Sequence, residues 1–222
     1  SLGILSSDNG TVTYDGEDQY VFSDTYHQLI FDGLGEKILM GDVSVNNNLI
    51  VNPGDTCIVG TNTLTVEGLT DIDGTITINS GSIDANGIFD AIGGTITFNG
   101  AGNLYLDSTV TSLGMFSASY STVAYDGTDQ EVKEATYHHL NLAGYGYKVL
   151  SGDIGATGDI NINPGVDFDV SYINNYSINI EGDWTNNGTF NERNGLVTFD
   201  GNDIQHIYSV DSLGGSYKQQ DF

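Results

Sequence analysis

The sequence contains little positive charge, with 5 Lys and Arg against 30 Asp and Glu in 222 residues and a formal net charge of −25. A nucleic-acid binder neutralises phosphates with a basic surface, and an anionic membrane attracts a polybasic segment. This chain has too few cations to form either kind of surface. We therefore expect no nucleic-acid partner and no docking onto an anionic membrane.

Cysteine pairs and long apolar runs are also missing. The single cysteine, Cys57, cannot form an internal disulfide or a multi-cysteine zinc site. No apolar run approaches the roughly 18 residues of a membrane-spanning helix, so we expect no membrane insertion. Residues 1–20 carry no positively charged segment followed by an apolar one, so any export signal is expected upstream. The 38% of hydrophobic residues suffice for a folded core.

The chain repeats itself. Residues 1–54 and 112–165 align at an offset of 111 without a gap, with 25 identical positions out of 54. The later parts match after small insertions and deletions, and a third copy begins at Ser212. We therefore predict repeat 1 over 1–111 with about five turns of chain, repeat 2 over 112–211, and the start of a third repeat over 212–222, all cut from a longer tandem array.

The local pattern predicts strands and turns. Short β-branched and aromatic runs are separated by Gly, Asn, Asp and Ser, and no window has a sustained helical period. Both prolines lie in Asn-Pro-Gly turns, where the glycine can take positive φ. The strands predicted in the first repeat are Thr11–Tyr14, Leu29–Phe31, Val43–Val45, Leu49–Val51, Leu64–Val66, Thr75–Ile78, Thr95–Phe98 and Leu104–Leu106.

Two all-β folds fit a repeat of 100–111 residues. One is a right-handed parallel β-helix, a β-solenoid, and the alternative is a series of tandem immunoglobulin-like sandwiches. The pattern Gly-Thr-[Ile/Val]-Thr recurs at 10–15, 74–79 and 94–99, and copies about 20 residues apart are typical of solenoid turns. We favour the β-helix, in which five turns make each repeat roughly 24 Å long.

The motifs of repeat 2 resemble a known group of proteins. They are Tyr125-Asp126-Gly127, the run from Tyr137 to Leu142, the run from Gly146 to Asp153, and the turn from Glu181 to Phe190. These segments resemble the tandem repeats of long secreted and cell-surface proteins of Bacteroidota-type bacteria. The resemblance implies export, β-helical rods, and a role as an adhesin, filament or spacer. Repeat 1 departs from it, with Asp71-Ile72-Asp73-Gly74 in place of the tryptophan turn.

The residues themselves suggest little chemistry. Paired carboxylates lack nearby cations, and the acidic surface repels polyuronate substrates, so we expect no catalysis. Asp71 and Asp73 offer hard oxygen ligands and are the candidates for a calcium site, the only cofactor considered. Exposed aromatic rings stack on sugars, and the candidates for that role are Trp184, Tyr26 and Tyr137, although their strand positions also suit inward packing.

The sequence thus predicts a structural or adhesive segment of a long extracellular bacterial repeat protein, a stalk or surface filament. Its expected location is the bacterial cell surface. Its expected partners are neighbouring repeats or subunits stacked end to end, together with surface glycans. Two alternatives stay open: a self-assembling extracellular filament subunit, and a carbohydrate-binding or carbohydrate-degrading β-helix.

Overall fold

The computed structural model describes residues 9–209 and 220–221. The chain divides into two compact units, Ser1–Ser121 and Thr122–Phe222, and each is described by itself. The secondary structure of the described residues consists of strands and turns, without a helix.

Unit 1 contains 17 strands in three sheets. Sheet 1A holds β1 (Thr11–Tyr14), β4 (Gln28–Phe31), β7 (Leu49–Val51), β10 (Thr70–Ile72), β13 (Phe89–Asp90) and β16 (Val110–Ser112). Sheet 1B holds β2 (Gln19–Val21), β5 (Gly35–Leu39), β8 (Asp55–Gly60), β11 (Thr75–Ile78), β14 (Thr95–Phe98) and β17 (Met115–Ser117). Sheet 1C holds β3 (Thr25–Tyr26), β6 (Val43–Val45), β9 (Thr63–Val66), β12 (Ser82–Ala85) and β15 (Asn103–Leu106).

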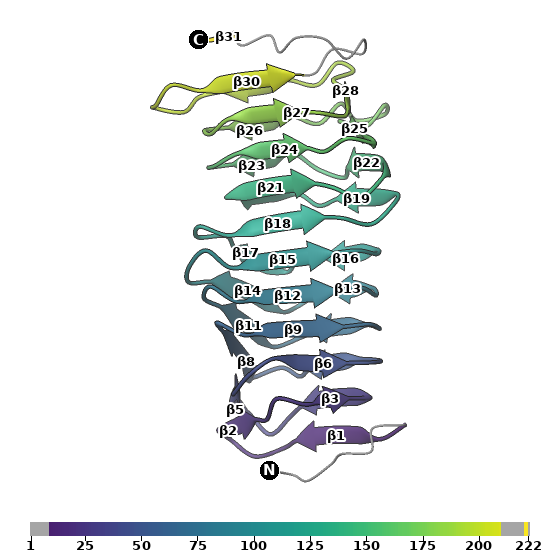
Figure 1. The fold of residues 1–222 in the computed structure, drawn as a ribbon, viewed down its shortest axis with the longest axis vertical. Helices are drawn as coiled ribbons and strands as arrows, with labels where there is room; N and C mark the ends of the chain where they lie inside the picture. Colours follow the sequence, from purple (N-terminus) through teal and green to yellow (C-terminus); the bar gives the residue numbers. More distant parts are fainter. Residues whose placement is uncertain (1–8, 210–219, 222) are drawn as a thin grey trace. The chain divides into compact units, whose positions relative to one another are not determined.

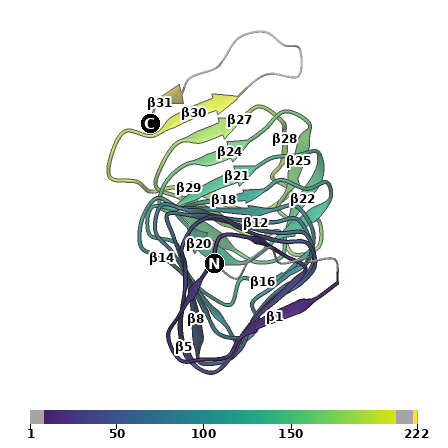
Figure 2. The ribbon, with the colours of Figure 1, turned by 60° about the horizontal axis from the view of Figure 1, so that its bottom comes forward.

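The strands of unit 1 pair in parallel with the strands one turn further along the chain. Thr75 of β11, for example, lies beside Thr95 of β14, and Leu49 of β7 lies beside Thr70 of β10. Figure 2 shows β5, β8 and β14 along one side of the coil and β1 and β16 along another. This arrangement confirms the predicted parallel β-helix. It rules out immunoglobulin-like sandwiches, because those are built from antiparallel sheets.

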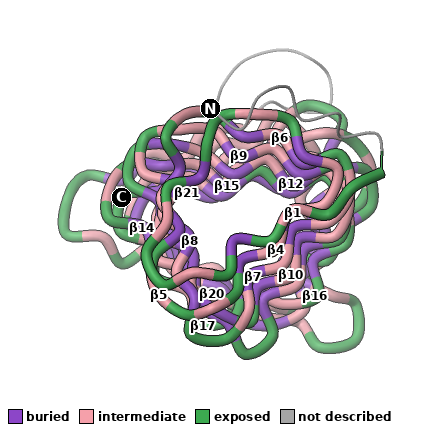
Figure 3. The backbone as a smooth tube through the Cα atoms, turned by 90° about the horizontal axis from the view of Figure 1, so that it is seen from below, coloured by how far each residue is buried: buried purple, intermediate pink, exposed green. Residues whose placement is uncertain are grey.

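Alternation along each strand places the core inside the turns. In β11 the side chains of Ile76 and Ile78 are fully buried, whereas Thr75 and Thr77 point to the outer face. Figure 3 shows the buried positions along the inner side of the tube. Each turn thus adds a layer of Val, Ile, Leu and Phe to a continuous apolar column.

Unit 2 repeats the plan. Sheet 2A holds β18 (Thr122–Tyr125), β21 (His139–Leu142), β24 (Ile160–Ile162), β27 (Trp184–Asn186), β30 (His206–Ser209) and β31 (Gln220–Asp221). Sheet 2B holds β19 (Gln130–Val132), β22 (Gly146–Leu150), β25 (Val166–Asp169) and β28 (Thr189–Asn191). Sheet 2C holds β20 (Ala135–Tyr137), β23 (Ile154–Ala156), β26 (Ile178–Ile180) and β29 (Val197–Phe199).

Pairing in unit 2 is again parallel, except that β31 runs antiparallel to β30. Figure 1 shows β21, β24, β27 and β30 stacked one above another. The 111-residue offset superposes β1 on β18 and β4 on β21, so the sequence repeat corresponds to equivalent turns. The predicted start of a third repeat, 212–222, lies outside the described residues except for 220–221.

All eight strands predicted in repeat 1 are present, with ends that agree within one residue. The Asn-Pro-Gly turns also behave as expected, because Gly54 and Gly165 have φ of 91° and 88°. The Cβ of any other residue at Gly54 would lie 2.5 Å from the side chain of Leu34, and at Gly165 it would lie 2.7 Å from the ring of Tyr145. Leu34 and Tyr145 are exposed side chains that can shift, so it is the positive φ that favours glycine at both positions.

Candidate functional site

Each unit has a lysine inside its core. Lys37 of β5 is fully buried, and its Nζ lies 2.7 Å from Oδ1 of Asp55, which is 1% exposed. The same ammonium donates hydrogen bonds to the carbonyl oxygens of Glu17 and Leu34, both at 2.9 Å. The turn carbonyls satisfy the ammonium group of this buried ion pair, whereas Oδ2 of Asp55 is buried without a hydrogen-bond partner.

Lys148 of β22 is the equivalent lysine in unit 2 and is also fully buried. Its Nζ donates to the carbonyl oxygens of Gly127, Thr128 and Tyr145 at 2.7, 2.5 and 3.3 Å. Two of these carbonyls are equivalent to those that hold Lys37 in unit 1. Val166 stands where unit 1 has Asp55. The turn carbonyls are therefore the part of the lysine site that both units share.

The aromatic residues proposed to stack on sugars are buried. Tyr26 and Tyr137 are 1% and 0% exposed, and Trp184 is 5% exposed. The hydroxyl of Tyr26 bonds that of Tyr14 at 3.0 Å, and the equivalent bond joins Tyr137 to Tyr125. These rings pack inside the turns and present no face to a ligand. The prediction that they bind sugars is therefore wrong, and inward packing, the other interpretation, is confirmed.

The calcium candidates lie on the outer side of sheet 1A and in the turn that follows it. Asp71 is on β10 beside Asp90 of β13, and Asp73 follows two residues later. Partial burial and the nearby charges of Asp73 and Asp90 raise the pKa of Asp71. Among residues 9–209 and 220–221, no three His, Cys, Asp or Glu side chains are arranged to hold a metal ion. Calcium binding by Asp71 and Asp73 therefore stays a prediction.

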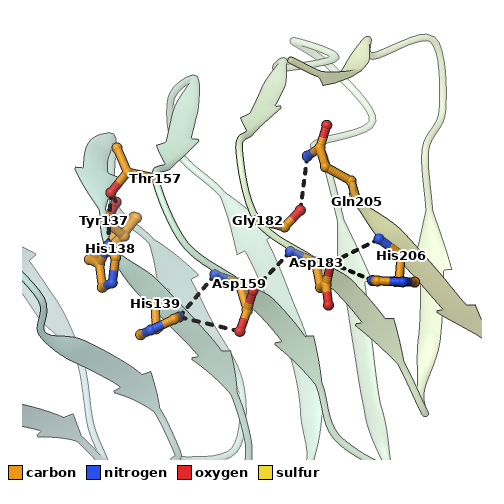
Figure 4. A network of polar contacts seen from close by, with 9 residues as sticks. All are labelled: Tyr137, His138, His139, Thr157, Asp159, Gly182, Asp183, Gln205 and His206. Carbon is orange, nitrogen blue, oxygen red and sulfur yellow. Dashed lines mark hydrogen bonds and ion pairs between the residues drawn. The ribbon is translucent and has the colours of Figure 1, made fainter. Parts of the chain in front are cut away.

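A column of four ionisable side chains crosses successive turns of sheet 2A (Figure 4). This polar column consists of His139, Asp159, Asp183 and His206, one at or just before the start of each strand from β21 to β30. The N–H of Asp183 donates to Oδ1 of Asp159, and the N–H of His206 donates to Oδ1 of Asp183, both at 2.8 Å. Each carboxylate thus holds the backbone of the next turn.

Nδ1 of His139 accepts a hydrogen bond from the N–H of Asp159 at 2.9 Å, so this nitrogen carries no proton in the arrangement observed. His138 packs beside it, with ring centroids 4.2 Å apart. Partial burial, followed by the neighbouring His139, lowers the pKa of His138. The polar column is therefore a set of side chains that cap the backbone of the next turn, and no sequence motif indicated it beyond the adjacent histidines.

The outer face of sheet 2B carries an exposed ring and a hollow that sequence reasoning missed. Tyr147 of β22 is 58% exposed, and beside it lies a hollow of about 350 Å³. Oδ1 of Asp129 accepts the backbone N–H of Tyr147 at 2.8 Å, which fixes the rim of the hollow. We call this feature the Tyr147 hollow. Its lining residues are Asp129, Gln130, Glu131, Tyr147 and Val149.

A second hollow, of about 570 Å³, lies on the outer face of sheet 2C. It opens where Gly155 of β23 stands between Thr136 and Asn179 in register, because glycine places no side chain on the face. Carboxylates of Glu134 and Asp153 line it. This hollow has polar groups but no aromatic side chain, so the Tyr147 hollow is the better candidate for binding a ligand.

Comparison with known proteins adds no relative, since no family model, no curated protein and no solved structure matches this chain. A search for membrane-crossing helices found none of sufficient length and apolarity within the part of the chain that the structure describes.

Proposed function

We propose that this chain is a structural and adhesive segment of a long extracellular bacterial repeat protein, either a stalk or a surface filament, without catalysis. The observation that carries the proposal is that two sequence copies build the same stacked interior. Both have the buried lysine held by turn carbonyls and the buried tyrosine pair. Units that repeat a self-supporting coil extend a protein in one direction, which suits a spacer.

The surface supports the same proposal. A net charge of −25 keeps neighbouring molecules apart in solution and favours long, separate rods over aggregates. The proposed partners are neighbouring repeats or subunits stacked end to end. In the described part of unit 1, β1, β2 and β3 each pair on one side only, with β4, β5 and β6. Such strand edges can accept the next set of strands.

The experiment uses antibodies raised against this chain and applied to intact source cells, followed by immunogold electron microscopy. Gold particles on thin projections outside the cell would support the proposal. Labelling that requires permeabilised cells would contradict the extracellular location. Labelled compact particles without projections would contradict the spacer role, while rods that lengthen by roughly 24 Å per repeat would support it.

A further inference from the structure

The residues that line the Tyr147 hollow have counterparts in unit 1, which are found by comparing the two repeats. The five lining positions of unit 2 correspond to Asp18, Gln19, Tyr20, Glu36 and Ile38 at the 111-residue offset. Asp, Gln and an aliphatic residue occupy the same places in both units. The tyrosine and the glutamate have exchanged positions, from Tyr20 and Glu36 to Glu131 and Tyr147.

The exchange keeps the same chemical groups on the same patch. Tyr20 of β2 lies beside Ile38 of β5, two residues along from Glu36, so tyrosine and glutamate are diagonal neighbours on one outer face. Oδ1 of Asp18 accepts the N–H of Glu36 at 2.9 Å, as Asp129 does for Tyr147. The tyrosine is exposed in both units, by 61% in Tyr20 and 58% in Tyr147.

Packing alone does not explain why this set recurs. A strand position that faces solvent accepts many polar residues. The residue differs between the repeats at both positions, with Tyr20 replaced by Glu131 and Glu36 by Tyr147. What both units keep is one exposed aromatic ring, two carboxylates and an aliphatic side chain around one place. That combination matches a pyranose, whose C–H face packs on an aromatic ring while its hydroxyl groups donate to carboxylates.

We propose that each unit carries a binding subsite for an uncharged saccharide, centred on Tyr20 in unit 1 and on Tyr147 in unit 2. The inference rests on the proposed adhesive function and names the ligand class. In unit 2 the saccharide ring packs on Tyr147 and Val149, and its hydroxyl groups donate to the carboxylates of Asp129 and Glu131. The hollow of about 350 Å³ has room for a ligand of one or two sugar rings.

Charge selects the saccharide. The cation beside the Tyr147 hollow, Lys133, is bound to Oε2 of Glu131 at 2.7 Å. A uronate or sulfated sugar would bring its negative charge next to Asp129, Glu131 and a strongly acidic surface. Neutral hexose chains avoid this repulsion and still offer hydroxyl donors. The subsites therefore accept neutral oligosaccharides and reject acidic ones.

The test is isothermal titration calorimetry of the whole chain with cellopentaose, mannopentaose, galactopentaose and, as the acidic control, pentagalacturonate. We expect one neutral oligosaccharide to bind with two sites per chain and pentagalacturonate not to bind. Replacing one tyrosine, in Tyr20→Ala or Tyr147→Ala, lowers the stoichiometry to one, with affinity at the altered subsite reduced about tenfold or more. The double variant loses binding.

An exchange variant makes the test specific. In the Tyr20→Ala background, Tyr147→Glu removes the remaining site, and adding Glu131→Tyr rebuilds the arrangement of unit 1 and restores binding. Tyr172→Ala is the matched control, because Tyr172 is 79% exposed on unit 2 but outside the hollow, and it leaves binding unchanged. Circular dichroism of each variant confirms that the β fold is intact.

Two results would overturn the proposal: failure of all three neutral oligosaccharides to bind the unmodified chain, or unchanged binding by the folded variant that lacks both tyrosines. Either would leave the stalk or filament role standing, since that role is tested by surface labelling of cells. A chain that binds sugars but is found inside the cell would overturn the extracellular role alone.

Discussion

Each unit buries one lysine ammonium group in its core, and the hydrogen-bond acceptors around that group differ between the two units. In unit 1, Lys37 has both turn carbonyls and the carboxylate of Asp55. In unit 2, Lys148 has three turn carbonyls, and Val166 takes the place of Asp55. The comparison shows that turn carbonyls hold the ammonium group in both units, whereas the carboxylate of Asp55 has no counterpart at position 166.

The two units also differ in the side chains that cap the backbone of the next turn. The polar column of unit 2 has His139, Asp159 and Asp183 where unit 1 has Gln28, Asn48 and Leu69. In both units the side-chain oxygen caps the next turn, since Oδ1 of Asn48 accepts the N–H of Leu69 at 3.0 Å. An amide caps the next turn in unit 1 and carboxylates do so in unit 2, so the same capping position differs in charge between the units.

The largest effect is expected from Lys37→Met. It leaves the carboxylate of Asp55 buried without its cation, which destabilises unit 1 by about 3–5 kcal/mol. Adding Asp55→Val, the residue that unit 2 has, recovers a large part of that loss. The readout is alkylation of Cys57, which is fully buried in unit 1 with its pKa raised by burial to about 12. Equal alkylation rates for the single variant and the unmodified chain would refute the role given to the pair.

The tyrosine pairs should also differ between units. The hydroxyl of Tyr125 accepts the N–H of Lys133 at 3.1 Å in addition to its bond with Tyr137. Tyr125→Phe leaves that N–H without its acceptor, and we expect a loss of about 1–3 kcal/mol. Tyr14→Phe, which removes the bond to Tyr26, is expected to lose about 1 kcal/mol.

Urea unfolding followed by the fluorescence of Trp184, the single tryptophan, reports unit 2, and alkylation of Cys57 reports unit 1. The expected order is a larger shift of the urea midpoint for Tyr125→Phe. The reverse order would show that the hydrogen bond to Lys133 contributes little.

We expect the stability of unit 2 to fall as the pH is lowered through about 6.5, the ordinary pKa of histidine, and His138 is one cause. Its pKa is lowered in the folded state, so the unfolded chain binds more protons at pH values between the lowered pKa and the ordinary histidine pKa of 6.5. Stability therefore rises with pH across this window and is lost on acidification. His138→Asn reduces the slope of the urea midpoint against pH, and a steeper slope in this variant would be the opposite of what we expect.

The smallest effect is expected from Lys133→Ala. The ion pair of Lys133 with Glu131 lies at the surface, with the Glu131 side chain 66% exposed. Such pairs contribute about 0–1 kcal/mol and weaken with salt. Unit 1 has Phe22 and Tyr20 at these places and forms the same turn. A shift of the urea midpoint as large as that of Tyr125→Phe would show that the ion pair stabilises unit 2 by more than about 1 kcal/mol.

The stacking of turns was predictable because strand, turn and repeat signals all agree. The strands that sequence reasoning missed in repeat 1 include those with polar residues at inward positions. In β5 the inward side chains include Lys37, and β8 begins with the buried Asp55. A charged residue ordinarily indicates a solvent face, so the alternation in these strands is misleading. The available signal was that Lys37 recurs as Lys148 in a chain with few cations.

Sequence reasoning missed the Tyr147 hollow for the same reason, because a charged residue faces the core where it was expected to face solvent. If Lys148 is assumed to face solvent, its neighbour Tyr147 must face the core, whereas the structure has the lysine inside and the tyrosine outside. Tyr26 and Tyr137 were equally ambiguous, because strand periodicity gives alternation but not its phase. The phase is set by tertiary contacts of the lysine with carbonyls of other turns, which no local pattern contains.

The buried lysine also affects whether each strand pairs with the correct neighbouring turn during folding. Successive turns resemble one another closely, as Thr-Ile-Thr-Ile in β11 and Thr-Ile-Thr-Phe in β14 show, so a strand that joins the wrong neighbour still buries its apolar residues. Lys37 makes the correct pairing more favourable than the shifted ones. Its ammonium finds the carbonyls of Glu17 and Leu34 only when its own turn is correctly placed. One buried lysine in every five or so turns therefore fixes the strand register of the turns around it.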